Sequence, residues 1–329
     1  MSSPAEAPAA VVRYAEALNL GMADALEEDE TVVLLGIDVG AGGGIFTVTR
    51  GLFERFGPER VIDTPISEMG YVGAAVGAAM TGLRPIVEIM FMDFIGVCLD
   101  PILNQAAKLP YMTAGALQCP IVFRTQTGAG RSAGAQHSQS LETMLAHVPG
   151  LRVVMPATVT DARDLLIAAV EDPNPVVFVE SRRLYGMKGT PDEDPLPLGR
   201  ARVARPGDDV TVVTWGQMLR ECLKAAEQSS ASLEVIDLRS LVPLDMDTVL
   251  RSAGRTGRLL IVHEAVQDFG AGAEIAARAG EELYDVLLAP VRRIGAPTVP
   301  MPFNPDLERS LMPSAAGVAA GAEALVRES

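Results

Sequence analysis

Two side chains in the first half of the chain have the type and setting needed to move a proton, Glu68 and His137. Glu68 follows Ser67, a residue type favoured as a helix N-cap, and the Gly- and Ala-rich run that begins there carries no other charge as far as Thr81. We therefore expect this helix to be buried and Glu68 to point into the interior. A buried carboxyl group has a raised pKa and can donate a proton.

His137 lies in a polar stretch, between Gln136 and Ser138, directly after a loop rich in Gly and Ala and before a predicted helix. Loops at the ends of parallel strands carry the functional sites of open α/β sheets. We therefore interpret His137 as a functional residue, although a histidine without such a context is more often structural.

The other two histidines indicate structural roles. His147 lies at the end of a predicted helix, where its ring can bond to the last carbonyl groups. His263 ends a predicted buried strand and could be a satisfied edge residue. The spacing of the three histidines matches no common zinc-binding pattern.

The segment Gly130–Gly134 matches G-x-S-x-G, the nucleophile elbow of serine hydrolases, with Ser132 as the nucleophile. That chemistry needs a strand running directly into the first glycine, a helix directly after it, and a histidine base. The surrounding GAGRSAGAQHSQ favours a long loop of small residues instead, and His263 could be the base only if the second half of the chain reached across. Because a five-residue pattern recurs by accident, this alternative is the weaker one.

Common nucleotide and metal motifs are missing. The sequence contains neither the GxxxxGK[ST] phosphate loop nor the HExxH zinc helix. Gly270–Gly272 follows a predicted strand and precedes a predicted helix, but the third glycine of a dinucleotide fingerprint is absent. Tight packing of the strand against the helix explains these glycines better.

Short apolar runs of strand length alternate with longer amphipathic runs, which indicates a parallel sheet covered by helices. This alternation defines the elements that must position the candidate residues. The predicted strands of the first half are Thr31–Gly36, Arg84–Met90, Ile121–Gln126, Leu151–Pro156 and Val176–Ser181. The predicted helices are Val12–Glu28, Ser67–Thr81, Gly96–Lys108, Ser138–His147 and Asp161–Glu171.

A stretch rich in Pro, Asp, Glu and Gly between Gly189 and Asp209 predicts a linker before a second α/β block. Its predicted strands are Val210–Thr214, Leu233–Asp237, Leu259–His263 and Val291–Gly295, and its predicted helices lie near Gln217–Gln228, Asp245–Ser252 and Gly270–Glu282. The fold class is therefore α/β, with one domain over residues 1–190, a linker over 191–208 and a second domain over 209–329.

Composition narrows the classes of function. Hydrophobic residues make up 48% of the 329 residues and charged residues 21%, which is typical of a folded, soluble protein. The formal net charge of −15 argues against a nucleic-acid binder and suits a basic protein partner.

Cysteine usage and hydropathy bear on the location of the protein. The three cysteines form no CxxC pair, so we expect a reducing cytoplasm and no disulfide framework. Residues Met1–Ala10 lack the features of a signal peptide, and charged residues or Gly interrupt every apolar stretch before it could span a membrane.

Asp63–Phe94 (DTPISEMGYVGAAVGAAMTGLRPIVEIMFMDF) resembles the beta subunit of the thiamine-diphosphate-dependent decarboxylating component of 2-oxo-acid dehydrogenase complexes. Matches in the same order extend over nearly the whole chain, at Gly134–Ser140, His147–Pro156, Asp172–Ser181 and Ala296–Phe303. Within that family, Ile89–Asp100, Arg124–Gly130 and Leu184–Gly189 are most similar to acetoin dehydrogenase beta subunits.

The resemblance implies a transketolase-like architecture, with a thiamine-diphosphate-binding (pyrimidine-type) domain followed by a C-terminal transketolase domain. It also implies roles for three residues. Glu68 matches the glutamate that bonds to the cofactor's pyrimidine ring and drives loss of the thiazolium proton, and Phe94 matches the aromatic residue that packs on that ring. His137 matches the histidine that handles protons during transfer to lipoamide.

The family binds the diphosphate through magnesium held by a GDG motif, and no GDG occurs in this sequence. In the family that motif belongs to the alpha subunit, so the resemblance implies an alpha2-beta2 heterotetramer in which this chain supplies half of each active site. It also implies a potassium site of mostly backbone carbonyls, at positions that match Ile121, Ala169, Val170, Asp172 and Asn174.

Two positions depart from the family pattern. The strand-end segment that usually reads GED or GEE is Gly36-Ile37-Asp38 here, and Val97 stands where many pyruvate-type members carry Gln or Glu. Those polar side chains line a tunnel proposed to pass a proton between the two active sites. Apolar residues at both positions put that communication in doubt.

The resemblance thus implies a beta subunit that helps to cleave acetoin or decarboxylate a 2-oxo acid and to pass the fragment to lipoamide, with a dihydrolipoyl acyltransferase as a further partner. Two alternatives stay open. The first is a free-standing two-chain thiamine enzyme that makes acyloins or serves biosynthesis, and the second is a non-catalytic docking scaffold. Glu68, Phe94 and His137 argue against the scaffold. The substrate stays open because much of the pocket belongs to the alpha subunit.

Overall fold

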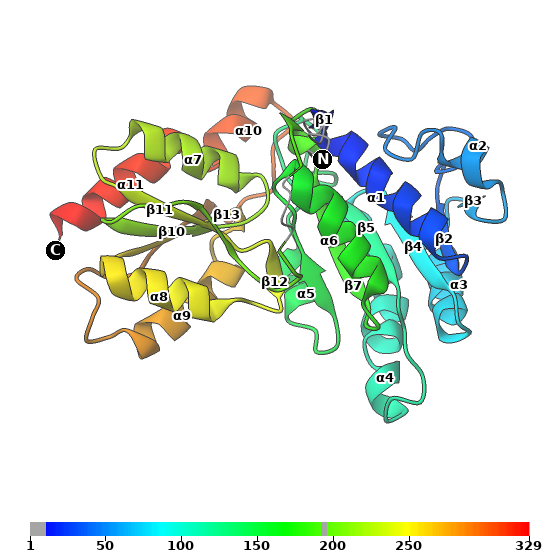
Figure 1. The fold of residues 1–329 in the computed structure, drawn as a ribbon. Coiled ribbons are helices and arrows are strands. Elements are labelled where there is room, and N and C mark those ends of the chain that lie inside the picture. Colours follow the sequence, from blue (N-terminus) through cyan, green and yellow to red (C-terminus); the bar gives the residue numbers. More distant parts are fainter. Residues whose placement is uncertain (1–10, 192–195, 329) are drawn as a thin grey trace, which may run out of the picture.

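The computed structural model describes residues 11–191 and 196–328, which form two α/β lobes (Figure 1). The expectation of no signal peptide concerns residues 1–10, and part of the predicted linker falls on residues 192–195, so both lie outside the described residues. In the part of the chain that the structure describes, no helix is long and apolar enough to cross a membrane.

The first lobe is built on a seven-stranded sheet with the order β12-β6-β7-β5-β4-β2-β3. All neighbours are parallel except β12 and β6, which are antiparallel. The strands are β2 (Val32–Gly36), β3 (Val61–Asp63), β4 (Arg84–Ile89), β5 (Val122–Thr127), β6 (Arg152–Val154), β7 (Val176–Ser181) and β12 (Ser240–Val242).

Helices cover both faces of this sheet, which is why its central strands are apolar along their whole length. Successive side chains of β2 point to opposite faces: Val32 and Leu34 join a core with α1 (Tyr14–Glu28) and α6 (Val159–Glu171). Val33 and Leu35 join a core with α3 (Glu68–Met80). The helix α3 packs against a 3₁₀ helix, η1 (Met92–Cys98), and a π-helix, η2 (Pro101–Ala106).

Three short helices and a two-stranded pair complete this lobe. The short helices are α2 (Leu52–Phe56), α4 (Leu109–Met112) and α5 (Glu142–Ala146), and a 3₁₀ turn, η3, spans Arg182–Leu184. The pair joins β1 (Val12–Arg13) to β8 (Lys188–Gly189).

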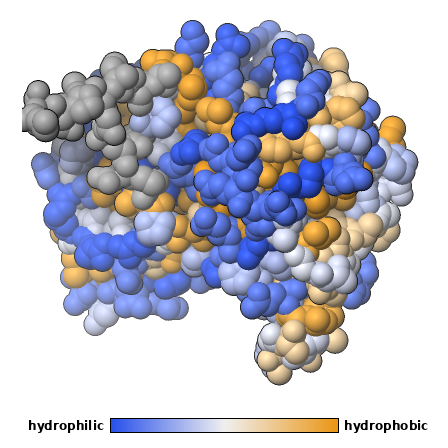
Figure 2. All heavy atoms as spheres, turned by 45° about the vertical axis from the view of Figure 1, so that its right-hand side comes forward, coloured by the Kyte–Doolittle hydropathy of each residue, from blue (hydrophilic) through white to orange (hydrophobic). Residues whose placement is uncertain are grey.

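The segment around α4 projects from the lobe, as Figures 1 and 2 show. It carries two highly exposed large side chains, Tyr111 at 89% and Met112 at 71%. An exposed apolar projection of this kind is typical of a surface that contacts another chain.

The second lobe contains a five-stranded sheet with the order β14-β13-β10-β11-β9. Its strands are β9 (Arg202–Arg205), β10 (Val210–Thr214), β11 (Leu233–Asp237), β13 (Leu259–Val266) and β14 (Arg292–Ala296). The helices are α7 (Met218–Gln228), α8 (Met246–Thr256), α9 (Ala271–Glu282), α10 (Pro305–Leu311) and α11 (Ala315–Arg327). The helices α7 and α11 cover one face of this sheet, and α8 and α9 cover the other (Figure 1).

The two lobes share backbone and charge contacts. The strand β12 comes from the second half of the sequence, yet it pairs with β6 at the edge of the first sheet. Just before it, Arg239 forms an ion pair of 2.7 Å with Asp161 of α6, and both side chains are fully buried. The C-terminal lobe is therefore anchored in the N-terminal one.

The structure confirms the predicted α/β class and the predicted strands, and it corrects two helices. The helix expected over Gly96–Lys108 is divided between η1 and η2. The helix expected over Ser138–His147 begins only at Glu142, because the backbone N–H groups of Gln139 and Leu141 donate to Asp93 Oδ1 and Met92 Sδ instead.

Several elements fall where none were predicted. The strand β9 lies inside the predicted linker and pairs antiparallel with β11. The helices α10 and α11, the 3₁₀ turn η3 and the short strand β3 were also not predicted. The domain boundaries at residues 190 and 209 stay predictions.

Candidate active site

The three residues singled out from the sequence follow the carboxyl ends of parallel strands. Glu68 begins α3 after β3, Phe94 lies in η1 after β4, and His137 lies in the loop after β5. Because these strands run parallel, their carboxyl ends share one edge of the sheet. Open α/β sheets place their binding sites at this edge.

The structure brings Phe94 and His137 into direct contact. Their ring centroids lie 5.4 Å apart in an edge-to-face arrangement. Phe91, which sequence reasoning missed, contacts the His137 ring at 4.8 Å and the Phe94 ring at 5.6 Å. The F-x-x-F spacing was a usable signal, since Phe91 directly precedes η1 and Phe94 lies in its first turn.

A second missed residue, Arg182, lies at the same cluster. Its guanidinium stands 4.3 Å from the centre of the Phe46 ring and 5.2 Å from that of Phe91. Burial and the nearby charge of Arg131 lower the pKa of Arg182 from its ordinary value. A cation therefore lies close to the rings that pack on His137.

Glu68 differs from the expectation of a buried acid. It is half-buried, and the helix α3 buries only one face, so Gly70, Ala74 and Gly77 are exposed. Within the described residues, its carboxylate has no hydrogen bond or ion pair. A half-buried carboxylate without a partner, at the favourable N-terminal end of a helix, is available to a ligand or to another chain.

The helix that Glu68 begins packs against η1, which carries Phe94. Burial, and after it the charge of Glu68, raise the pKa of the Cys98 thiol to about 12. The Cys98 Sγ in turn donates to the carbonyl of Phe94 at 3.7 Å. The buried Cys98 thiol thus contacts the backbone of Phe94, and its pKa responds to the charge of Glu68.

A cavity of about 300 Å³ adjoins the loop that carries His137. Residues Ser138–Leu141 line it from the first lobe, and Glu264–Val266 and Thr298–Met301 line it from the second. Glu264 is buried there, and its Oε1 accepts the backbone N–H of Ala129 at 2.7 Å. Burial, and then the charge of Glu142, raise the pKa of Glu264 to about 7.

In the wild type, the Glu264 carboxyl group makes the folded protein less stable as the pH rises. Glu264→Gln is expected to remove this pH dependence. The pKa of this group is raised from 4.5 to about 7, so between these values the unfolded chain binds fewer protons than the folded one. The free energy of unfolding therefore falls as the pH rises through this window, by up to about 3 kcal/mol for this group. Urea unfolding at pH 5 and pH 8 should show a smaller fall for Glu264→Gln than for the wild type. The exposed Glu59→Gln is the control, and an equal fall in all three proteins would contradict the prediction.

The structure does not support the serine-hydrolase alternative. No helix follows Ser132 directly, since α5 begins only at Glu142. The Ser132 N–H donates to Glu308 at 2.8 Å, which fixes the loop by a structural contact. His263 is fully buried against Trp215, and burial lowers the pKa of its ring to about 4.

Four of the residues matched to a potassium site lie at or just after the C-terminal end of α6, and the fifth, Ile121, directly precedes β5. The carbonyls of Ala169 and Val170 lack intrahelical donors, because residue 173 is proline and the Asn174 N–H donates to the Asp172 side chain. Free carbonyls at the negative end of a helix suit a monovalent cation. Arg84 already donates to the Val170 carbonyl at 2.7 Å, so a guanidinium uses part of this site.

One residue matched to the potassium site, Asp172, already uses its side chain in an ion pair. Asp172 forms an ion pair of 2.6 Å with Arg152. The carbonyl of Ile121 accepts the N–H of Val176. In the described part of the chain, no group of three or more His, Cys, Asp or Glu side chains is arranged to hold a metal ion.

The two positions that depart from the family pattern lie in different settings. Ile37 is buried in the core with α3, and Val97 is 53% exposed on η1. An acid in place of Ile37 would be surrounded by apolar side chains, so isoleucine suits its position here.

Comparisons with known proteins cover nearly the whole chain. The family model "Transketolase, pyrimidine binding domain" matches residues 10–188, and "Transketolase, C-terminal domain" matches residues 199–318. A solved structure titled "Split gene transketolase, inactive beta4 tetramer" has a TM-score of 0.76 at 23% identity, over 96% of this chain and 98% of that one. That likeness shows the fold.

Curated relatives are similar at higher identity. The acetoin:2,6-dichlorophenolindophenol oxidoreductase subunit beta of Bacillus subtilis is 46% identical, over 93% of this chain and 94% of the relative. The 2-oxoisovalerate dehydrogenase subunit beta of the same organism is 43% identical, over 92% of this chain and 94% of the relative. The pyruvate dehydrogenase E1 component subunit beta of Rhizobium meliloti is 44% identical, over 96% of this chain and 70% of the relative.

Proposed function

Because this chain belongs to the transketolase-like family of beta subunits of thiamine-diphosphate-dependent dehydrogenases, we propose that it supplies half of an active site that cleaves acetoin or decarboxylates a 2-oxo acid. The observation that carries this proposal is the arrangement of Glu68, Phe94 and His137. Glu68, whose carboxylate has no partner within the described residues, begins the helix α3, which packs against η1. Phe94 of η1 contacts the ring of His137 in the loop after β5.

The residues present fit the pyrimidine end of thiamine diphosphate. Glu68 would hold a ring nitrogen by a charge-assisted hydrogen bond, which a desolvated site strengthens. Phe94 would pack on the ring, and His137 would hold or move a proton at the reacting end of the substrate. When bound, the cofactor supplies a carbanion at its thiazolium carbon.

The diphosphate end needs a second chain. This sequence has no GDG motif, so we propose that an alpha subunit holds magnesium and the diphosphate in an alpha2-beta2 heterotetramer. The half-exposed Glu68 supports this arrangement, because a partner surface would complete its burial.

The isolated chain is expected to bind thiamine diphosphate and magnesium negligibly, because it lacks the groups that neutralise the diphosphate. Calorimetry should detect no saturable binding by the chain alone and clear binding after the GDG-bearing chain is added. Tight, magnesium-dependent binding by the isolated chain would contradict the two-subunit proposal.

We also propose that the product acyl group passes to lipoamide on a dihydrolipoyl acyltransferase. The net charge of −15 supports docking of a basic domain of that enzyme. Affinity for such a domain is expected to fall as the salt concentration rises from about 0.05 to 0.5 M, because salt screens the attraction. Titrations at both salt concentrations test this, and equal affinities, or no binding, would favour the free-standing enzyme instead.

Two further proposals concern the setting of the protein. The three buried, free cysteines suit a cytoplasmic location. Potassium would bind at the end of α6 near Ile121, Ala169, Val170, Asp172 and Asn174, where it would share the Val170 carbonyl with Arg84. The choice among acetoin, pyruvate and branched-chain substrates rests with the partner's half of the pocket.

A further inference from the structure

The loop that leads to His137 is bound by carboxylates from the other lobe. Glu308 of α10 accepts the backbone N–H of Gly130 at 2.7 Å through Oε1 and that of Ser132 at 2.8 Å through Oε2. Glu264, at the end of β13, accepts the N–H of Ala129 at 2.7 Å. Three of four successive N–H groups thus donate to two side chains that lie 135 or more residues away in the sequence.

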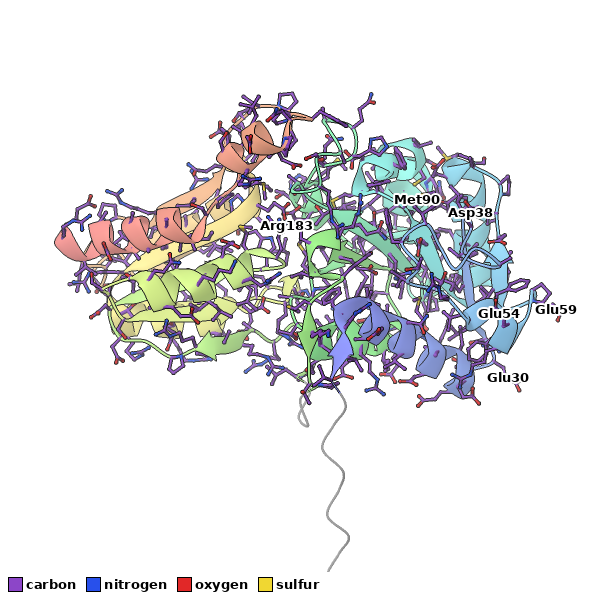
Figure 3. All side chains as sticks on the ribbon, turned by 90° about the horizontal axis from the view of Figure 1, so that it is seen from above. Glu30, Asp38, Glu54, Glu59, Met90 and Arg183 are labelled. Atoms are coloured by element: carbon purple, nitrogen blue, oxygen red, sulfur yellow. The ribbon has the colours of Figure 1, made fainter. Side chains whose placement is uncertain are left out.

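The loop is shaped to make these contacts. Gly128 and Gly130 have φ values of +95° and +97°, a conformation that favours glycine. A Cβ atom on Gly128 would lie 2.0 Å from Glu264 Oε1, and one on Gly130 would lie 2.5 Å from the Cδ of Arg183. Arg183 lies where the two lobes meet (Figure 3). The backbone conformation therefore favours glycine at both positions, and a larger residue would displace the Glu264 carboxylate or the Arg183 side chain.

The two carboxylates are buried, and neither forms an ion pair within the described residues. Buried carboxylates need hydrogen-bond donors, and the loop N–H groups supply them. Glu308 is also held in place from its own helix, because Asn304 caps the N-terminus of α10 by accepting from Asp306 and Leu307. These contacts are therefore built into both lobes.

The same loop is fixed again just after His137. Gln139 Nε2 donates to Asp93 Oδ1 at 2.8 Å, which ties the loop to η1. Between the two attachments the chain is mostly Gly, Ala and Ser, whose small side chains offer few packing contacts. The position of His137 against Phe91 and Phe94 therefore depends on the attachments at each end.

We propose that Glu308 and Glu264 are positioning residues for His137, which they hold in place through the backbone of its loop. The C-terminal lobe then takes part in the reaction without touching the substrate. This proposal rests on the proposed function of His137. A side chain displaced by about 1 Å can lower a rate about 100-fold, so small shifts of this loop matter.

The test uses the complete heterotetramer with Glu308→Ala and Glu308→Gln. Glutamine keeps an acceptor for a loop N–H, whereas alanine removes it. Glu323→Ala is the matched control, because Glu323 accepts the backbone N–H of Ser230 at 3.0 Å elsewhere in the same lobe. The readouts are amide hydrogen exchange in peptides covering residues 128–141, kcat and KM, and thermal stability.

Glu308→Ala is expected to speed amide exchange at residues 130 and 132 and to lower kcat about 10- to 100-fold with little change in KM. Glu308→Gln should recover part of kcat, because glutamine keeps one of the two acceptors, and Glu323→Ala should change neither loop exchange nor kcat. In a His137→Ala background, Glu308→Ala should lower kcat no further, because it acts through the histidine.

If amide hydrogen exchange in the loop is unchanged in Glu308→Ala, the positioning proposal is wrong, and the proposed function of His137 is not affected. An equal loss of kcat in the wild-type and His137→Ala backgrounds would also overturn the positioning proposal, since Glu308 would then act on something other than His137. Normal kcat in His137→Ala with Glu308 intact would instead contradict the proposed function of the histidine.

Discussion

A Glu68→Gln chain, assembled with its partner and loaded with cofactor, is expected to exchange the thiazolium proton of thiamine diphosphate about 100-fold or more slowly than the wild type. Glutamine keeps the shape of the side chain and its position at the start of α3. It carries no charge and cannot share a proton with the pyrimidine nitrogen as a carboxylate does. Every later step should slow with the exchange, whichever substrate is used.

The measurement is quenched-flow exchange in deuterium oxide, read by NMR of the extracted cofactor. The matched control is Glu54→Gln, because Glu54 also lies in the first turn of a helix but is exposed at the outer edge of the first lobe (Figure 3). Cofactor binding is measured in parallel. Normal exchange in a Glu68→Gln tetramer with cofactor bound would contradict the proposed role of Glu68.

His137→Ala is expected to leave that exchange largely intact and to lower turnover by about 100- to 10,000-fold. The reason is that His137 lies in a different loop from Glu68 and is assigned to proton transfer after the cofactor is activated. The loss should appear in substrate turnover or in acylation of lipoamide. Steady-state and single-turnover kinetics on the same tetramer separate these steps.

His147→Ala is the matched control, since this exposed histidine follows α5 and has no ring contact with Phe91, Phe94 or His137. It should keep turnover near the wild-type value. A His137→Ala tetramer that loses thiazolium exchange as severely as Glu68→Gln would show that the two residues do not have separate roles.

The predicted strands were recovered because their patterns are local. Parallel strands buried on both faces read as unbroken apolar runs, as in β2 and β7. The helices that were wrong or missed depend on contacts distant in sequence. The residues before α5 are not helical because their N–H groups donate to Asp93 and Met92. These acceptors lie more than 40 residues away in the sequence, so the residues around position 140 could not reveal them.

The site was predictable in type but not in detail. Glu68, Phe94 and His137 follow strand ends, so their placement at one edge could be expected from topology. The ion pairs within the first sheet could not be predicted in this way. Arg124 pairs with Glu88 at 2.8 Å and with Glu180 at 2.7 Å, and all three residues are buried and far apart in the sequence. The same holds for the contact of Glu308 with the His137 loop. Glu68 is half-buried because α3 buries only one face, which the charge-free run after it did not reveal.

The pairing of β12 with β6 has a consequence for any attempt to cut this protein into pieces. A fragment that ends at residue 190 would keep every parallel strand of the first sheet but would lose Ser240–Val242 and the Arg239 that neutralises Asp161. It would then present the bare N–H and C=O groups of β6 at a new open edge, a template for association with other chains. It would also remove both arginines, Arg202 and Arg239, that pair with Asp161 among the described residues. A cut between the lobes therefore damages the first sheet, whereas a cut after Val242 would divide the second sheet, so the two lobes are expected to be stable only as one chain.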